Sequence, residues 1–415
     1  MITNSRSDNV NTRNLVVDIL LAVTRDGAFS HIAIRDVLDK YRYLPKQDRA
    51  FITRLSQGTI ERMIELDAII NQFSKTKVKK MKPVIAAILR SGVYQLKYMD
   101  SVPDSAACNE AVKLTVKRGF GGLKGFVNGV MRTIARNMDQ IRYPDAEKEP
   151  VRYLSVKYSI PEWLVQRFTE QYGAEACERS LAAYLMPHPT SVQVDTDRSS
   201  VEEIIASLEQ QGITVRRNEQ VERALFLSGY EALDEIEEFE NGLLYVQDTA
   251  SMLAVELAAP KQGDHVIDVC AAPGKSVYAA RMIGEQGHVE ARDLTEYKVE
   301  MIEENIDRCR ISNMTAKVWD ARVFDEAARE KADVVIADLP CSGLGVIGTK
   351  TDIKYNASEE KIAELAALQQ EILHVVCGYV KPDGTLLYST CTMTREENED
   401  NVQKFLETHA GFELE

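Results

Sequence analysis

Hydrophobic positions divide the chain into a helical first third and a later part in which strands alternate with helices. From residue 10 to 138, apolar side chains recur every three or four positions, as in Leu15, Ile19 and Val23, which is the spacing of an amphipathic helix. Prolines stand where three of these helices are expected to begin, at Pro45, Pro83 and Pro103. The pattern predicts an all-α domain over residues 1–140.

A polar segment with two prolines, NMDQIRYPDAEKEP at 137–150, predicts a linker after this domain. Beyond it, Ser159 and Glu162 match a capping box, and Pro161 and Gly173 mark the expected ends of one helix. Strands are then expected at 191–196, 213–217 and 225–229, with a helix at 199–212. We therefore expect a small α+β connector over residues 150–240.

Apolar strands alternate regularly with amphipathic helices from residue 241 onward. The expected strands are 265–269, 288–293, 316–320, 333–338 and 384–390. Such alternation predicts a parallel, doubly wound sheet, in which ligands bind beyond the carboxyl ends of the strands. The chain is thus predicted to be multidomain, with an α/β Rossmann-like domain at 241–415.

The net charge of −14 is distributed unevenly along the chain. Residues 1–150 hold 25 Lys+Arg against 16 Asp+Glu, whereas residues 151–415 hold 25 against 48. Lysines and arginines gather in KTKVKKMK at 75–82 and in KLTVKRGFGGLKG at 113–125. Runs of this kind suit the phosphate backbone of a nucleic acid, although a solvated lysine-rich surface is an equal alternative.

Composition and cysteine spacing exclude several protein classes. With 45% hydrophobic and 27% charged residues, the chain has no apolar run near the roughly 20 residues that span a bilayer. The polar start MITNSRSDNV lacks the core of a signal peptide, so we expect a cytoplasmic protein without membrane association. The seven cysteines include no CxxC pair, so neither a disulfide framework nor a metal site is expected. Four of them lie in helical patterns and are expected to be small buried hydrophobes: Cys108, Cys177, Cys309 and Cys377.

Small or polar groups stand at the end of every expected strand of the last domain. After the first strand, the turn AAPGK at 271–275 would let backbone amides approach a ligand at a helix N-terminus. It is not a P-loop, because Val269 stands where that motif needs glycine. Asp293, at the end of the second strand, suits the hydroxyls of a ribose, and Asp320 suits the amine of an adenine. Either acid alone could be a helix cap, but together with the turn they favour an adenosine site.

Two further strands end near cysteines. The fourth carries Asp338 and is followed by Cys341 in DVVIADLPCSG, and the fifth leads to Cys391 in LLYSTCTM. A low-pKa thiolate that adds to carbon 6 of cytosine makes carbon 5 able to accept a methyl group from a sulfonium. Buried, inert thiols are the alternative for both cysteines.

With these residues in place, the order of parts resembles an S-adenosylmethionine-dependent methyltransferase sheet, and the turn after its first strand lacks the GxGxxG of the NAD enzymes. The chain further resembles the RNA cytosine-5 methyltransferases of the NOL1/NOP2/Sun family, in its bacterial 16S ribosomal RNA branch of the Sun (Fmu) type. The matching motifs are VQDTAS (246–251), DVCAAPGK (268–275), ADLPCSGLGVIGTKTDIKY (337–355) and LLYSTCTMTREENE (386–399).

The resemblance implies a fold and a set of roles. The fold would be an all-α NusB-like N-terminal domain that binds RNA, a small α+β connector and an α/β class I methyltransferase domain. The fifth strand would lie beside the fourth, so that Cys341 and Cys391 face each other. Cys391 would be the nucleophile, Cys341 would promote product release, and Asp338 would hydrogen-bond ring nitrogen 3 of the base. S-adenosyl-L-methionine would be held by Cys270, Ala271, Ala272, Pro273, Gly274, Lys275, Asp293, Asp320 and Asp338.

The implied substrate is a cytosine flipped out of a loop or single strand of 16S ribosomal RNA, modified by a monomeric enzyme. The sequence departs from the family pattern in two places. The turn AAPGK is one glycine shorter than the usual AAPGGK, which is expected to re-aim the amides that meet the cofactor. The chain ends at GFELE, where the family usually continues through a closing strand pair, so we expect a truncated domain with an exposed sheet edge.

Two other functions compete with this one. A non-catalytic RNA-binding or ribosome assembly factor that keeps the methyltransferase fold would fit the shortened turn. An enzyme that methylates amino groups would need an (N/D/S)PP(Y/F) motif at the fourth strand, where DLPCSG instead places a cysteine.

Overall fold

The computed structural model describes residues 10–415, so most of the polar start used to predict localisation lies outside the described residues. The chain forms two compact units. The helical unit comprises Met1–Met186 and Val346–Ala357, and the mixed unit comprises Pro187–Gly345 and Ser358–Glu415. Within residues 10–415, no helix has the length and hydrophobicity to cross a bilayer.

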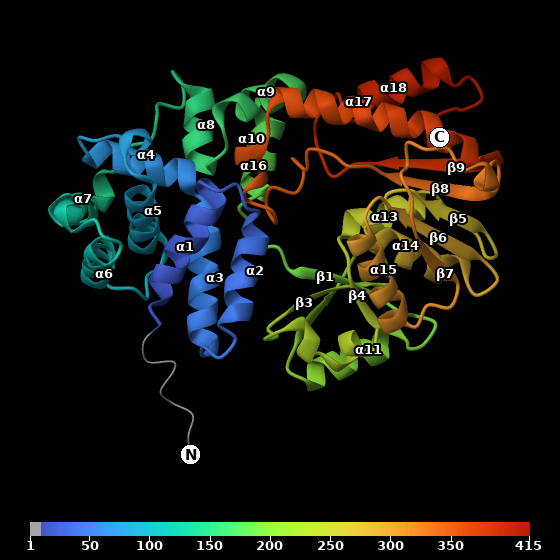
Figure 1. Ribbon diagram of the computed structural model, residues 1–415, viewed down its shortest axis with the longest axis horizontal. Coiled ribbons are helices and arrows are strands. Elements are labelled where there is room, and N and C mark those ends of the chain that lie inside the picture. Colours follow the sequence, from blue (N-terminus) through green and yellow to red (C-terminus); the bar gives the residue numbers. More distant parts are fainter. Residues whose placement is uncertain (1–9) are drawn as a thin grey trace. The chain divides into compact units, whose positions relative to one another are not determined.

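The first part of the helical unit is all α, as its apolar periodicity predicts (Figure 1). Its helices are α1 (Thr12–Thr24), α2 (Ser30–Lys40), α3 (Lys46–Glu61), α4 (Met63–Phe73), α5 (Pro83–Tyr98), α6 (Asp104–Lys117) and α7 (Lys124–Arg136). Pro83 is the first residue of α5, and Pro45 and Pro103 directly precede α3 and α6. The apolar stripes of these helices form one buried core.

Three more helices complete this part of the unit: α8 (Pro150–Tyr158), α9 (Glu162–Tyr172) and α10 (Ala174–Ala183). Gly173 ends α9 as predicted, but the predicted capping box at Ser159 is wrong. Ser159 instead has a left-handed backbone after α8, with φ 56°, and its hydroxyl accepts a hydrogen bond from the Ile64 amide at 2.9 Å. The Ser159 hydroxyl therefore binds the distant Ile64 amide and does not cap α9. The capping box that does form is Ser200 with Glu203, at the start of α11.

A short segment far along the chain belongs to the helical unit. It contains α16 (Ile353–Asn356). The side-chain nitrogen of Lys354 donates to the carbonyl oxygen of Glu61 at 2.7 Å, and the Tyr355 hydroxyl donates to that of Ile60 at 2.8 Å. Both acceptors lie in the last turn of α3, whose carbonyls lack partners further along the helix. The segment therefore caps α3.

The mixed unit contains a four-stranded antiparallel sheet in the order β2-β3-β1-β4. Its elements are β1 (Thr190–Val194), α11 (Val201–Gln210), β2 (Thr214–Arg217), β3 (Ala224–Ser228), α12 (Glu237–Glu240) and β4 (Leu244–Val246). β1, β2 and β3 match the predicted strands of the connector, whereas β4 has no predicted counterpart because it is only three residues long. β4 pairs with β1 and forms one edge of this sheet.

The second sheet has five strands, all parallel, in the order β7-β6-β5-β8-β9. The strands are β5 (His265–Asp268), β6 (His288–Asp293), β7 (Met314–Val318), β8 (Ala332–Asp338) and β9 (Val380–Ser389). The helices are α13 (Thr249–Leu257), α14 (Gly274–Ile283), α15 (Glu296–Cys309), α17 (Glu359–Val376) and α18 (Glu399–Thr408). The strands and their order agree with the predicted Rossmann-like fold, and β9 forms one edge.

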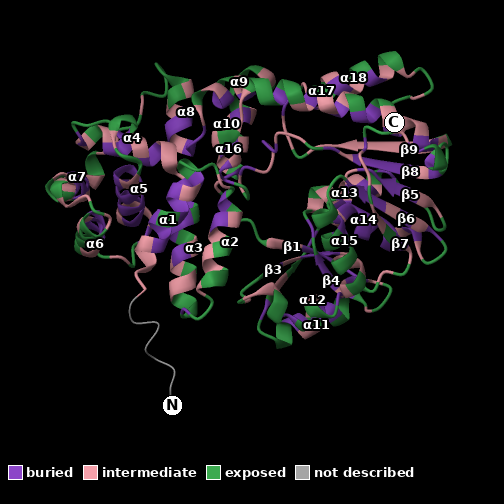
Figure 2. Cartoon of the chain, viewed as in Figure 1, coloured by how far each residue is buried: buried purple, intermediate pink, exposed green. Residues whose placement is uncertain are grey.

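Helices cover both faces of this sheet, which is why its central strands are buried on both sides (Figure 2). α13, α14 and α15 pack on one face, where Val266 and Val289 meet Val277 and Ile302. α17 and α18 pack on the other, where Val335 meets a cluster that includes Phe405. Because the strands are parallel, their carboxyl ends lie together along one rim of the sheet.

The buried lysine of α16 makes the stability of the helical unit depend on pH. Burial lowers the pKa of Lys354 from 10.5 to about 7. Between these values the unfolded chain binds the proton and the folded one does not, so stability should rise with pH, by at most about 1.4 kcal/mol per pH unit. We expect urea unfolding from pH 7 to pH 9 to show this rise in the wild type and a flatter profile in Lys354→Met. Parallel profiles would contradict the burial of a neutral amine.

Candidate active site

The ends of β8 and β9 bring two thiols together. In the parallel register Asp338 pairs with Ser389, and each strand then continues into a loop that carries a cysteine. The sulfur atoms of Cys341 and Cys391 are 2.9 Å apart, and the Cys391 amide donates to the sulfur of Cys341 at 3.2 Å. The two cysteines singled out in the sequence therefore lie side by side.

The two thiols differ in environment. Cys391 is exposed, whereas Cys341 is half-buried. The hydrogen bond with the Cys391 thiol, together with burial, raises the pKa of Cys341 well above its ordinary value. Cys341 therefore keeps its proton at neutral pH. An accessible thiol beside one that retains a proton suits a nucleophile paired with a proton donor.

Gly345 allows the two cysteine loops to touch. Its amide donates to the carbonyl oxygen of Cys391 at 3.0 Å. A Cβ atom at this position would stand 2.9 Å from that same oxygen, closer than side chains are found to backbone. The absence of a side chain at Gly345 is thus required for the observed spacing of the loops.

Asp338 is held by two neighbours at the tip of β8. Its carboxylate forms an ion pair with the Lys275 ammonium at 2.6 Å and accepts a hydrogen bond from the Ser389 hydroxyl at 2.8 Å. The same ammonium lies 3.4 Å from the Ser251 hydroxyl. Sequence reasoning placed Lys275 in the cofactor turn but missed this pair. Ser251 belongs to the motif VQDTAS, and nothing in the sequence marks its contact with Lys275, 24 positions away.

The turn after β5 is anchored to the neighbouring strand. The Ala271 amide donates to the carbonyl oxygen of Arg292 at 2.7 Å, and α14 begins at Gly274. At the base of the turn, Asp268 is buried, and burial raises the pKa of its carboxyl to about 7. One of its oxygens accepts from the Ser276 hydroxyl, and the other has no partner among the described residues. The turn thus offers backbone amides and an unsatisfied carboxyl oxygen.

The two acids predicted to contact adenosine stand at adjacent strand ends. The Trp319 amide donates to the carbonyl oxygen of Asp293 at 2.9 Å, which ties the end of β6 to the residue before Asp320. The Asp293 carboxylate also binds the Thr295 amide at 3.0 Å and the Lys298 ammonium at 3.1 Å. Asp320 pairs with Arg322, which lowers the pKa of its carboxyl. Both carboxyl groups are therefore fixed in place by nearby donors.

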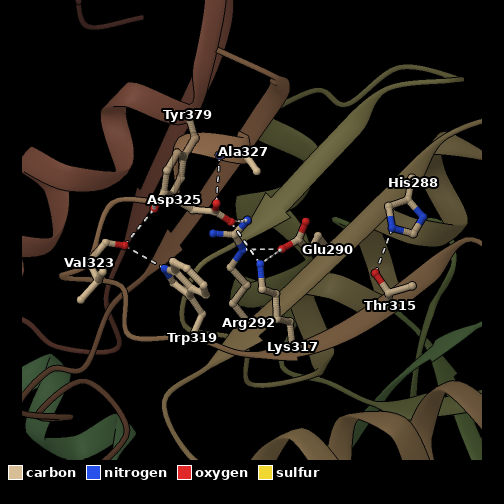
Figure 3. Close-up of polar contacts among 10 residues, drawn as sticks. All are labelled: His288, Glu290, Arg292, Thr315, Lys317, Trp319, Val323, Asp325, Ala327 and Tyr379. Atoms are coloured by element: carbon tan, nitrogen blue, oxygen red, sulfur yellow. Dashed lines mark hydrogen bonds and ion pairs between the residues drawn. The ribbon is translucent and has the colours of Figure 1, made fainter. Parts of the chain in front are cut away.

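A buried charge network underlies this region of the sheet (Figure 3). Arg292, only 1% exposed, pairs with Glu290 at 2.7 Å and with Asp325 at 3.0 Å. The indole N–H of Trp319 donates to the carbonyl oxygen of Val323 at 2.8 Å, closing the loop that carries Asp320. Separating a buried ion pair leaves an uncompensated charge, so the network opposes separation of the groups that it joins.

The remaining cysteines have the expected structural role in three of four cases. Cys108, Cys177 and Cys309 are buried in hydrophobic surroundings. Cys377 is only half-buried, which differs from the prediction, because it follows the last turn of α17 in a short 3-10 turn.

Comparisons with known proteins agree with this architecture. A family model described as "16S rRNA methyltransferase RsmB/F" matches residues 255–415, "NusB family" matches 10–136, and "Methyltr_RsmF/B-like, ferredoxin-like domain" matches 160–233. The "Probable ribosomal RNA small subunit methyltransferase B" of Bacillus subtilis is 36% identical, over 97% of this chain and 89% of its own. Its namesake from Synechocystis is 32% identical, over 98% and 91%.

Solved structures show the same fold. The structure named "Crystal Structure of PH0851" aligns with a TM-score of 0.79 and 27% identity, over 96% of this chain and 90% of that one. A methyltransferase homolog protein from Pyrococcus horikoshii aligns with a TM-score of 0.56 and 26% identity, over 62% and 82%. The central antiparallel sheet is accordingly ferredoxin-like, and the parallel sheet is that of a Rossmann-like methyltransferase.

The unequal environments of the thiols predict an order of alkylation. Cys391 is exposed, whereas burial and the nearby Asp268 raise the pKa of Cys270 to about 12, so its thiolate is scarce at neutral pH. We expect N-ethylmaleimide at pH 7 to label Cys391 first. Labelling of Cys270 should stay slow at pH 7 and should increase as pH rises. Peptide mapping by mass spectrometry measures both, with unfolded protein as the control; equal rates in the folded protein would contradict this environment.

Proposed function

Because the chain belongs to the 16S rRNA methyltransferase RsmB/F family, we propose that it methylates carbon 5 of a cytosine in 16S ribosomal RNA through a covalent cysteine adduct. The observation that carries this proposal is the 2.9 Å approach of the Cys341 and Cys391 sulfur atoms. A methyltransferase that acts on an amino group or hydroxyl needs no thiol. One that acts on an unactivated pyrimidine carbon needs a nucleophile to activate the ring.

The residues around the turn after β5 fit S-adenosylmethionine. The unpartnered oxygen of Asp268 and the amides that precede α14 suit a polar, partly cationic ligand, and the carboxylate of Asp293 suits ribose hydroxyls. We assign cofactor binding to residues 270–275, Asp293, Asp320 and Asp338. When bound, the cofactor supplies an electrophilic methyl group. The start of α14 at Gly274 supports binding in spite of the shorter turn.

The proposed steps use the chain's own side chains in sequence. The Cys391 thiol loses its proton as its sulfur bonds to carbon 6 of the flipped cytosine, the double bond between carbons 5 and 6 breaks, and ring nitrogen 3 gains a proton. Carbon 5 would then accept the methyl group that a bound cofactor supplies. Asp338, held by Lys275, accepts a hydrogen bond from ring nitrogen 3 and stabilises the adduct. The bond between carbon 6 and sulfur next breaks as the double bond between carbons 5 and 6 forms again. The Cys341 sulfur takes the proton that carbon 5 loses, and ring nitrogen 3 returns its proton to water. Cys341 promotes this release by giving its proton to the departing Cys391 sulfur, which lies within reach.

The RNA would be held mainly through its phosphates. Residues 1–150 carry an excess of nine positive charges, and this part of the chain matches the NusB family. Acidic residues outnumber basic ones in residues 151–415. We therefore assign binding of the RNA phosphates to the helical part and methyl transfer to the mixed unit. A base in a loop or single strand leaves its stack at the lowest cost, which makes such a cytosine the proposed target. We assign the activity to a cytoplasmic monomer.

Trapping of the adduct tests the two thiols separately. We expect Cys341→Ala to accumulate a covalent complex with unmodified 16S RNA in the presence of cofactor, because the adduct forms but is released slowly. Cys391→Ala should give none. A denaturing gel detects the complex, and labelled cofactor with mapping of the modified nucleotide identifies the product. The reverse pattern would exchange the roles, and a methyl group on any atom other than carbon 5 of cytosine would refute the proposal.

A non-catalytic RNA-binding factor remains the second candidate because the turn AAPGK is one residue shorter than the family pattern. Calorimetry with S-adenosylmethionine separates the two. We expect saturable binding by the wild type and at least about tenfold weaker binding by Asp293→Ala, which loses the acceptor for ribose hydroxyls. Asp307→Ala, outside the proposed site near the end of α15, serves as the control. No heat at millimolar cofactor would favour the binding factor.

A further inference from the structure

Glu397 is a buried carboxylate that none of the steps above uses. It lies in the loop after Cys391 and is 0% exposed. One oxygen accepts from the Ser342 amide at 2.8 Å, and the other accepts from the hydroxyls of Ser342 at 2.5 Å and Thr394 at 2.6 Å. Two of these bonds come from the residue next to Cys341. Glu397, which follows Cys391 in the chain, thus binds Ser342, the neighbour of Cys341.

Gln369 of α17 extends this contact to the other side of Cys341. Its amide nitrogen donates to the carbonyl oxygen of Pro340 at 2.8 Å and to Glu397 at 3.2 Å. Both chain neighbours of Cys341, Pro340 and Ser342, are therefore held by a single buried pair of side chains.

The loop of the second thiol is held in the same way. The hydroxyls of Ser342 and Thr392 lie 2.7 Å apart. The side chain of Asn398, next to Glu397, accepts from the Thr390 hydroxyl at 2.6 Å and donates to the carbonyl oxygen of Thr392 at 3.3 Å. Cys391 is therefore also bracketed by two held neighbours.

From this arrangement we infer that Glu397 is a positioning residue that sets the distance between the Cys341 and Cys391 thiols, an inference that rests on the proposed function. A buried carboxylate is stable only while its hydrogen bonds are made, and bonds from an amide to a carboxylate are stronger than neutral ones. Movement of the Cys341 loop away from Glu397 would remove both donors of Ser342 from this charge. Glu397 therefore penalises arrangements in which the Cys341 loop moves away from the segment that follows Cys391.

Disulfide formation measures the thiol spacing without RNA or cofactor. Diamide takes two electrons and two protons from a pair of thiols and becomes the hydrazine, leaving a disulfide. In the wild type the sulfurs need to approach by less than about 1 Å to reach bonding distance. We expect the Cys341–Cys391 disulfide to form rapidly, and peptide mapping measures its formation over time. Glu397→Ala should slow it by more than about tenfold, and should lower single-turnover methyl transfer by about a hundredfold.

Matched variants separate positioning from a general loss of structure. Glu397→Gln keeps the length and one acceptor oxygen, so it should restore much of the disulfide rate. Glu399→Gln, at an exposed carboxyl two residues on, should match the wild type. Cofactor affinity and the thermal unfolding midpoint of Glu397→Gln should be close to those of the wild type, and its turnover should recover together with its disulfide rate. Wild-type disulfide rates in both Glu397 variants would overturn the inference. A slowed disulfide in a chain that never methylates RNA would refute the proposed function and leave the positioning role intact.

Discussion

The parallel pairing of β8 with β9 is the constraint on which the site depends. Opposite Asp338 stands Ser389, and this register carries both strands to the same rim before their loops turn towards each other. Side chains alternate between the faces of a strand, so a slip of one residue would send the polar tip of β9 into the packing of α17 and α18. The apolar faces that bury β8 therefore also fix where the sulfur atoms meet. Core packing and chemistry are specified by the same hydrophobic pattern.

Charge at the site is arranged around one ion pair between the turn after β5 and the end of β8. Lys275 reaches from the turn after β5 to Asp338 at the end of β8, which links the region assigned to the cofactor with the region assigned to the base. Removing either member would leave its partner as an isolated charge in a poorly solvated place, which costs several kcal/mol. Asp268 avoids that cost differently, because the pKa of its carboxyl, raised to about 7, lets it become neutral. The rim thus holds one acid whose carboxyl pKa is raised, Asp268, and another whose pKa is lowered, Asp320.

The parts of the fold that could be predicted from the sequence are those encoded by local pattern. Alternation of strands and helices predicted the parallel sheet, and motif resemblance supplied its order and the meeting of Cys341 with Cys391. β4 was missed because three residues carry too little pattern, and Ser159 was misassigned because a distant amide competes for its hydroxyl. The bonds of Glu397 to Ser342, 55 positions apart, have no local signature. Side-chain contacts across a fold depend on backbone placement that only the structure supplies.

The inclusion of Val346–Ala357 in the helical unit has a consequence for synthesis on the ribosome. The helices up to Met186 emerge early, yet the residues that cap the end of α3 are translated more than 150 positions later. During that interval the nascent amino-terminal part must persist with its last-arriving piece missing, open to chaperones and proteases. A fragment ending near Met186 would reproduce this unfinished state permanently. The helical unit is in this sense completed by translation of the catalytic half.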